Sequence, residues 1–119
     1  MSTFELLERL TTTPGIPGRE HRIRALILKE IKEIFDEISV DPLGSIIARK
    51  GPVTKKNMVV KNAPKVMLAA HMDQIGFMVS HIDDKGFLYL NPVGGFDPRN
   101  LFSRMVTICP DPNDPKKDL

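Results

Sequence analysis

A histidine and an aspartate two positions apart, His71 and Asp73, have the side-chain types of a metal site. In an extended chain, residues at this spacing project from the same face. They follow an apolar run, Val66 to Ala70, and ligands of α/β proteins gather beyond the carboxyl ends of such strands. A neutral imidazole binds zinc well, and a neighbouring carboxylate can orient it. The spacing indicates a metal ligand with its partner, although an ordinary surface pair has the same spacing.

Other residues with ligating or reactive side chains have simpler explanations. His21 falls in the first turn of an expected helix, which favours a surface position, and His81 lies on an alternating strand, where it is packed or exposed. Asp83 and Asp84 suit a turn. The single cysteine, Cys109, has no histidine beside it in sequence and is expected to be a small buried apolar residue.

The composition is that of one globular domain without a nucleic-acid or membrane partner. The chain has 119 residues, of which 41% are hydrophobic and 27% charged. Lys and Arg number 17 against 15 Asp and Glu, interspersed along the chain, which argues against a nucleic-acid-binding protein. One cysteine excludes an internal disulfide and fits a reducing compartment. No apolar run approaches the roughly 18 residues of a membrane span, and the start of the chain lacks the pattern of a signal peptide. We therefore expect a cytoplasmic protein.

Hydrophobic periodicity predicts two helices followed by strands. Ser2 and Glu5 have the spacing of a capping box at the start of a short helix, and a longer amphipathic helix is expected over about 19–35. Alternation over 37–49 predicts a hairpin with a turn in its middle, and the aperiodic stretch 50–65 predicts a loop. Further strands are expected at 66–70, 75–81, 87–90 and 105–109. The first of them is a continuous apolar run, typical of a strand that is covered on both faces.

Four stretches of the sequence together resemble one enzyme family. They are Thr13-Pro14-Gly15-Ile16-Pro17-Gly18-Arg19-Glu20, Val40-Asp41-Pro42-Leu43-Gly44, Leu68-Ala69-Ala70-His71-Met72-Asp73-Gln74-Ile75-Gly76-Phe77-Met78-Val79 and Asn91-Pro92-Val93-Gly94-Gly95-Phe96-Asp97. In this order they are similar to the amino-terminal third of the dinuclear-metal aminopeptidases of the glutamyl- and deblocking-aminopeptidase type. That family includes proteins called endoglucanase M and several tetrahedral assemblies. The stretch around His71 is the most specific element of the resemblance.

The resemblance implies an α/β fold in two parts. Residues 1–74 correspond to the amino-terminal portion of the zinc-peptidase α/β domain. Residues 75–109 correspond to the first strands of an inserted β-barrel that serves as a lid and in dimerisation. Residues 110–119 do not match the family and are expected to form a flexible tail.

The resemblance also implies roles for the pair. In this family the histidine at the position of His71 binds one of two catalytic divalent metal ions, usually zinc or cobalt. The aspartate at the position of Asp73 is grouped with the catalytic residues because it orients that histidine. A catalytic zinc needs about three protein ligands, and the family's other ligands and its general-base glutamate lie beyond the end of this sequence. This chain is therefore expected to bind one metal ion at most, and weakly.

Two functions of different kinds follow. The first is a truncated metal-dependent aminopeptidase, which in its full-length form removes amino-terminal residues from peptides. On this hypothesis the chain alone is inactive and assembles as a homo-oligomer or with a complementary half-chain. The alternative is a non-catalytic interaction module that pairs through the edges of the strands at 75–109. Glycoside hydrolysis, which the older family label suggests, ranks last because no pair of carboxylates stands out for it.

Overall fold

The computed structural model describes residues 2–52, 60, 62–111 and 113–119, and its first element is a helix with the predicted start. Helix α1 covers Thr3–Thr12. The Ser2 hydroxyl accepts a hydrogen bond from the Glu5 backbone N–H (3.2 Å), and the Glu5 carboxylate accepts one from the Ser2 N–H (2.6 Å). This reciprocal pair satisfies amide donors that a helix start leaves without a partner, which confirms the predicted capping box.

Helix α2 covers His21–Ile31 and is shorter than the predicted 19–35. It carries Ile23, which is 3% exposed and is the one buried hydrophobic side chain in the described part of the chain. The apolar periodicity continues to Ile34, but that side chain is 54% exposed and the helix has already ended. The physical reason is that an apolar stripe stabilises a helix only where it packs against a partner.

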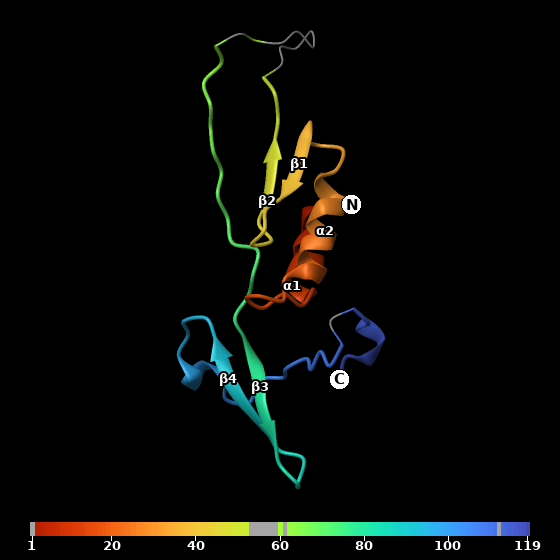
Figure 1. The fold of residues 1–119 in the computed structure, drawn as a ribbon, viewed down its shortest axis with the longest axis vertical. Coiled ribbons are helices and arrows are strands. Elements are labelled where there is room, and N and C mark those ends of the chain that lie inside the picture. The colour runs from red at the N-terminus through yellow and green to blue at the C-terminus, as the bar shows by residue number, and fades with distance from the viewer. Residues whose placement is uncertain (1, 53–59, 61, 112) are drawn as a thin grey trace.

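Strands β1 and β2, Glu37–Val40 and Ile46–Arg49, form the predicted antiparallel hairpin (Figure 1). In its turn, one carboxylate oxygen of Asp41 accepts hydrogen bonds from two backbone N–H groups (2.9 and 2.8 Å). Gly44 has a φ of 93°, in the left-handed region that glycine adopts without strain. An aspartate and a glycine three residues later thus set the turn that the sequence predicts.

Strands β3 and β4, Gly76–Ile82 and Leu88–Val93, form a second antiparallel hairpin with one bulge. Its turn uses Asp83, whose carboxylate accepts hydrogen bonds from two N–H groups (3.0 and 2.9 Å). The predicted strand at 105–109 is not formed, and those residues have no regular secondary structure. The chain is therefore a mixed α/β chain with two helices and two small sheets in its described residues. A barrel built around the second hairpin stays an expectation.

The segment 66–70 corrects the prediction of a buried strand. It runs extended (Figure 1), yet it belongs to neither sheet, and Val66, Met67 and Leu68 are 83%, 88% and 93% exposed. A strand of this composition is buried by neighbours on both edges and both faces. Among the described residues, no backbone group pairs with this segment, so its apolar side chains lie on the surface. The predicted loop at 50–65 falls partly outside the described residues.

The C-terminal residues fold back toward α2. Ile108 and Leu119 exchange two backbone hydrogen bonds (2.9 and 3.0 Å). The Arg22 guanidinium pairs with both carboxylate oxygens of Asp118 (2.5 and 3.1 Å), and this hydrogen bonding lowers the pKa of that carboxyl. Two short 3-10 helices lie in the last quarter of the chain, at Pro98–Leu101 and Pro115–Lys117. The division of the chain at residues 74 and 109 stays a prediction.

The molecule is elongated and leaves much of its surface uncovered. It measures 66 × 27 × 27 Å, and its radius of gyration is 18.9 Å, whereas a compact chain of this length has about 13.5 Å. Its accessible surface is 10427 Å², against about 6,500 Å² for a compact protein of 13.4 kDa.

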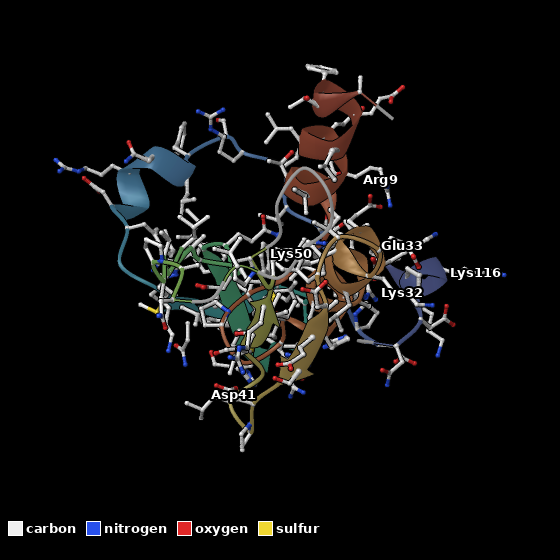
Figure 2. All side chains as sticks on the ribbon, turned by 90° about the horizontal axis from the view of Figure 1, so that it is seen from above. Arg9, Lys32, Glu33, Asp41, Lys50 and Lys116 are labelled. Carbon is white, nitrogen blue, oxygen red and sulfur yellow. The ribbon has the colours of Figure 1, made fainter. Side chains whose placement is uncertain are left out.

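Helices α1 and α2 are joined by an ion pair between Arg9 and Glu30 (2.8 Å), and Figure 2 shows Arg9 reaching toward α2. No helix in the described residues has the length and apolar character needed to cross a membrane.

Candidate functional site

His71 and Asp73 lie at the end of the extended segment, just before β3 begins. Nδ1 of His71 is 3.0 Å from Oδ1 of Asp73. Because an ionised carboxylate only accepts hydrogen bonds, Nδ1 carries the proton and its N–H donates a hydrogen bond to Asp73. The His71 side chain is 93% exposed, which leaves Nε2 open to a ligand. The two side chains thus have the histidine–carboxylate arrangement that orients a metal-binding imidazole.

The turn between α1 and α2 anchors the residues that follow the pair. The Gln74 N–H donates a hydrogen bond to the Gly15 carbonyl (2.8 Å). Gly15 is buried against Ile23, and a Cβ at Gly15 would overlap the Ile23 side chain. A Cβ at Gly76 would likewise overlap Ile16. The two glycines therefore allow the turn and the start of β3 to pack together, which fixes the pair to the helical end of the molecule.

The contact shifts the acid–base equilibria of both groups. The hydrogen bond to Asp73, and then the charge of Asp73, raise the pKa of His71 above its ordinary value. The hydrogen bond from His71 lowers the pKa of Asp73. Both shifts favour the imidazolium–carboxylate pair. A metal ion binds the neutral imidazole, so metal binding at His71 is expected to weaken as the pH falls through the raised pKa.

We expect His71 to titrate above about 6.5, the ordinary histidine value, in an NMR titration of its imidazole signals. Asp73→Asn is expected to lower the midpoint, because it removes the carboxylate charge and keeps the size of the side chain. A raised folded-state pKa stabilises the fold fully below the unfolded-state pKa, and this contribution is lost as the pH rises through the folded-state pKa. If His71 titrates with the same midpoint in the unchanged chain and in the Asp73→Asn protein, the hydrogen bond between His71 and Asp73 is not present in solution.

The described residues supply one ligand position and not a complete metal site. Among them, no group of three or more His, Cys, Asp or Glu side chains is placed to hold a metal ion. A catalytic zinc site needs about three protein ligands. His71, with Asp73 behind it, fits one such position. The other ligands of a dinuclear centre are not found among the described residues.

The remaining candidates have structural roles, with one correction. Asp83 holds the β3–β4 turn, as predicted, and His81 is exposed on β3 with its ring centroid 5.5 Å from that of Tyr89. Cys109 is exposed, whereas the sequence predicts a buried thiol. The reason is that its segment lies on the surface as irregular chain instead of forming a strand. Its sulfur lies 3.9 Å from Nη1 of Arg22, a contact between residues too distant in sequence for any pattern to predict.

A groove of about 730 Å³ lies beside the pair. We call it the α2 groove, and it is lined by Ile27 and Ile31 of α2, Ile46 and Ala48 of β2, and residues 68–73. Figure 1 shows the extended segment descending beside β2 toward the site. Sequence reasoning missed this groove because it predicted that the segment is buried. The signal that could have found it is the apolar run itself, which needs a neighbour that the predicted elements do not include.

Comparisons with known proteins identify one family. A family model described as M42 glutamyl aminopeptidase matches residues 44–114, which is more than half of the chain and includes His71 and Asp73. The lysyl aminopeptidase of Pyrococcus furiosus is 42% identical over 108 residues, which are 89% of this chain and 28% of that protein. A putative aminopeptidase of Acetivibrio thermocellus is 50% identical over 103 residues, which are 87% of this chain and 28% of that protein.

Solved structures agree with these relatives. PhTET1-12s, described as a dodecamer in the asymmetric unit, is similar with a TM-score of 0.73 and 37% identity over 90% of this chain and 30% of that chain. An endoglucanase of Thermotoga maritima has a TM-score of 0.65 and 36% identity over 80% of this chain and 28% of its own. The chain spans less than a third of the length of each of these relatives. The chain belongs to the M42 glutamyl aminopeptidase family.

Proposed function

We propose that this chain is the amino-terminal part of a metal-dependent aminopeptidase and supplies one metal ligand, His71, to its active site. The observation that supports this most directly is the 3.0 Å contact between His71 Nδ1 and Asp73, with Nε2 left open, inside the segment that matches the family. Asp73 acts on the imidazole, since it fixes the proton on Nδ1 and directs the lone pair of Nε2 outward. It is a positioning residue, because it acts on the metal site through its hydrogen bond with His71.

The proposed cofactors are two divalent metal ions, zinc or cobalt, bound in the full-length enzyme. When bound, such ions supply Lewis-acid chemistry to peptide hydrolysis. This chain would hold at most one of them, and weakly, because one imidazole is a small part of the usual ligand set. The remaining ligands and the general base come from polypeptide outside these 119 residues.

The proposed substrates are peptides with a free amino terminus. The relatives carry different residue preferences in their names, lysyl for the Pyrococcus furiosus protein and glutamyl for that of Lactococcus lactis, at 42% and 37% identity. We therefore propose no preference of this chain for a particular amino-terminal residue.

We further propose that the protein forms a homo-oligomer, since the PhTET1-12s relative is described as a dodecamer. The single cysteine fits a reducing, cytoplasmic setting.

A second candidate function is a non-catalytic module that pairs with a complementary peptidase chain. It is favoured by the exposed apolar run Val66, Met67 and Leu68, since contiguous exposed apolar surface marks an interaction site. The two functions differ in one observable. If the chain is part of an enzyme, its complex with the complementary chain has aminopeptidase activity that depends on His71. If the chain is a non-catalytic module, the complex forms but has no activity that depends on His71.

The isolated chain is expected to show no hydrolysis of aminoacyl-anilides with zinc or cobalt added. The reason is that one ligand and its partner do not assemble the site. The measurement is the release of the aniline over hours at high protein concentration, with a full-length M42 enzyme as the positive control. Clear turnover that is lost in His71→Ala contradicts the expectation, because it would mean that the 119 residues form a working centre.

A further inference from the structure

The segment that carries His71 and Asp73 has one backbone attachment to the helical end of the molecule. The Gln74 N–H donates a hydrogen bond to the Gly15 carbonyl (2.8 Å), and residues 66–73 make no hydrogen bond to other backbone groups among the described residues. Figure 1 shows the chain between α1 and α2 meeting this segment just before β3. The turn between the two helices therefore decides where the pair lies.

The turn that makes this attachment is fixed by its own residues. In Ile16-Pro17-Gly18-Arg19, the Arg19 N–H donates a hydrogen bond to the Ile16 carbonyl (2.8 Å), and Gly18 has a φ of 78°. Proline at the second position and a glycine of positive φ at the third position are typical of a type II β-turn. The Glu20 carboxylate accepts a hydrogen bond from the Gly18 N–H (2.6 Å), which holds the turn against the start of α2.

One side chain of the turn contacts the start of β3. Gly76 is the first residue of β3, and a Cβ added there would overlap Cγ2 of Ile16 and would lie 3.3 Å from the Ile16 Cβ. Only a residue without a side chain lets Ile16 approach the β3 backbone so closely, so glycine is required at this position. The Ile16 side chain consequently lies directly against the backbone that follows the pair.

Two adjacent residues of the turn thus hold the segment at two points. The hydrogen bond between Gly15 and Gln74 fixes one distance but leaves the segment free to rotate about that bond. The contact between Ile16 and Gly76, two residues further along, removes this freedom because it blocks movement of β3 toward the turn. Ile23, which is 3% exposed, packs behind Gly15 and keeps the turn itself in place.

We propose that Ile16 is a positioning residue for the metal ligand, because its side chain, seated against Gly76, directs His71 and Asp73 into the α2 groove. Both residues of the pair line that groove together with residues 43–46 of the β1–β2 hairpin. A histidine strengthens a site of several ligands only where its nitrogen meets the others, and a displacement of about 1 Å has large effects at such sites. The inference rests on the proposed function for the role of His71.

The test adds a methyl group at Gly76 and then removes the methyl group that it meets. Gly76→Ala is expected to raise the exchange rate of the Gln74 amide by about tenfold or more in the isolated chain, because the overlap with Ile16 pushes the segment away from Gly15. Gly76→Ala combined with Ile16→Ala is expected to restore the rate, since Cγ2 is then absent. Gly76→Ala combined with Ile16→Val is expected to leave the rate high, because valine keeps this methyl group.

A second measurement follows the position of His71 directly. Co²⁺ alone, added in small amounts, binds imidazole and broadens the NMR signals of nearby nuclei. The broadening that disappears in His71→Ala belongs to this site, and in the unchanged chain it is expected to reach the amides of residues 43–46 across the groove. Gly76→Ala is expected to lose the broadening at 43–46. Of the two double variants, the one with Ile16→Ala is expected to regain it and the one with Ile16→Val is not.

Gly86→Ala is the control that separates positioning from stability. Gly86 has a φ of 85° in the β3–β4 turn, so alanine there is strained, but no described atom other than those of its neighbours lies within 4 Å of the added Cβ. The variant is expected to lower the melting temperature. It is expected to leave the Gln74 exchange rate and the broadening at 43–46 unchanged, because Gln74 is exposed and its amide exchanges through local opening.

Three results would overturn the inference. They are unchanged exchange and broadening in Gly76→Ala, equal behaviour of the two double variants, and the same change in Gly86→Ala as in Gly76→Ala. Should Gly76→Ala fail to fold, Ile16→Ala alone decides, since it removes the contact without an overlap and is expected to lose the broadening at 43–46. If no broadening depends on His71, the proposed function fails, and the Gln74 exchange rates still show whether Ile16 positions the segment.

Discussion

Replacement of His71 by alanine is expected to abolish the activity of a reconstituted peptidase made from this chain and its complementary polypeptide. Loss of a metal ligand removes the metal or its correct placement, and we expect kcat/KM to fall by about 10³-fold or more, equivalent to about 4 kcal/mol in the barrier. The measurement combines aminoacyl-anilide kinetics with the metal content of the purified complex. A fall in both quantities is the expected result.

Two further variants separate a ligand from a merely structural residue. Asp73→Asn is expected to lower metal affinity by about 10- to 100-fold, the usual effect of removing the carboxylate behind a ligating histidine. His81→Ala is the control, because His81 is an exposed histidine on β3 whose ring lies beside Tyr89 and not beside Asp73. If the His71 and His81 substitutions have the same effect on activity and metal content, His71 is not a ligand.

Replacement of Ile23 by aspartate is expected to remove the cooperative unfolding transition of the isolated chain. Ile23 is 3% exposed and packs against Gly15, so the new carboxylate would be buried without a partner. An unpaired buried charge costs about 3–5 kcal/mol, which approaches the whole stability of a small domain. Thermal melts followed by far-UV circular dichroism measure the effect.

The matched control for this substitution is Ile34→Asp. Ile34 follows the same helix, but it is 54% exposed, and a surface substitution of this kind changes stability by about 0.5 kcal/mol or less. The conservative Ile23→Val protein is expected to lose about 0.5–1.5 kcal/mol. Equal melts for the two aspartate variants would mean that Ile23 does not form the core of the helical end.

Local features of this fold were predictable from the sequence, because their chemistry is contained within a few residues. The capping box of Ser2 and Glu5 spans four positions, and the turn set by Asp41 and Gly44 spans a similar length. The turn at Asp83 follows the same rule. In each case one side chain satisfies backbone groups of its own turn, so no knowledge of distant chain is needed.

Features that depend on distant chain were not predictable. The run at 66–70 has the composition of a central strand, but whether such a strand is buried is decided by its neighbours. The periodicity predicts a helix that continues past Ile31, but the helix ends there for the same reason: Ile34 is 54% exposed, and no described residue covers it enough to stabilise another turn. The pairing of Arg22 with Asp118 joins positions 96 residues apart and has no sequence signature. The sequence was enough to single out His71 and Asp73 as a possible site. It was not enough to predict that a hydrogen bond from Gln74 to Gly15 anchors them.

The elongated outline of the molecule has a consequence for any solution measurement of its assembly. A particle of 66 × 27 × 27 Å experiences more hydrodynamic friction than a sphere of equal mass. The monomer will therefore diffuse slowly and elute early from a gel-filtration column, at the position of a heavier globular standard. If only the elution volume were measured, the early elution of the monomer would be misinterpreted as self-association. The stoichiometry of this chain therefore has to be established by a quantity that does not depend on shape, such as scattered light intensity or native mass.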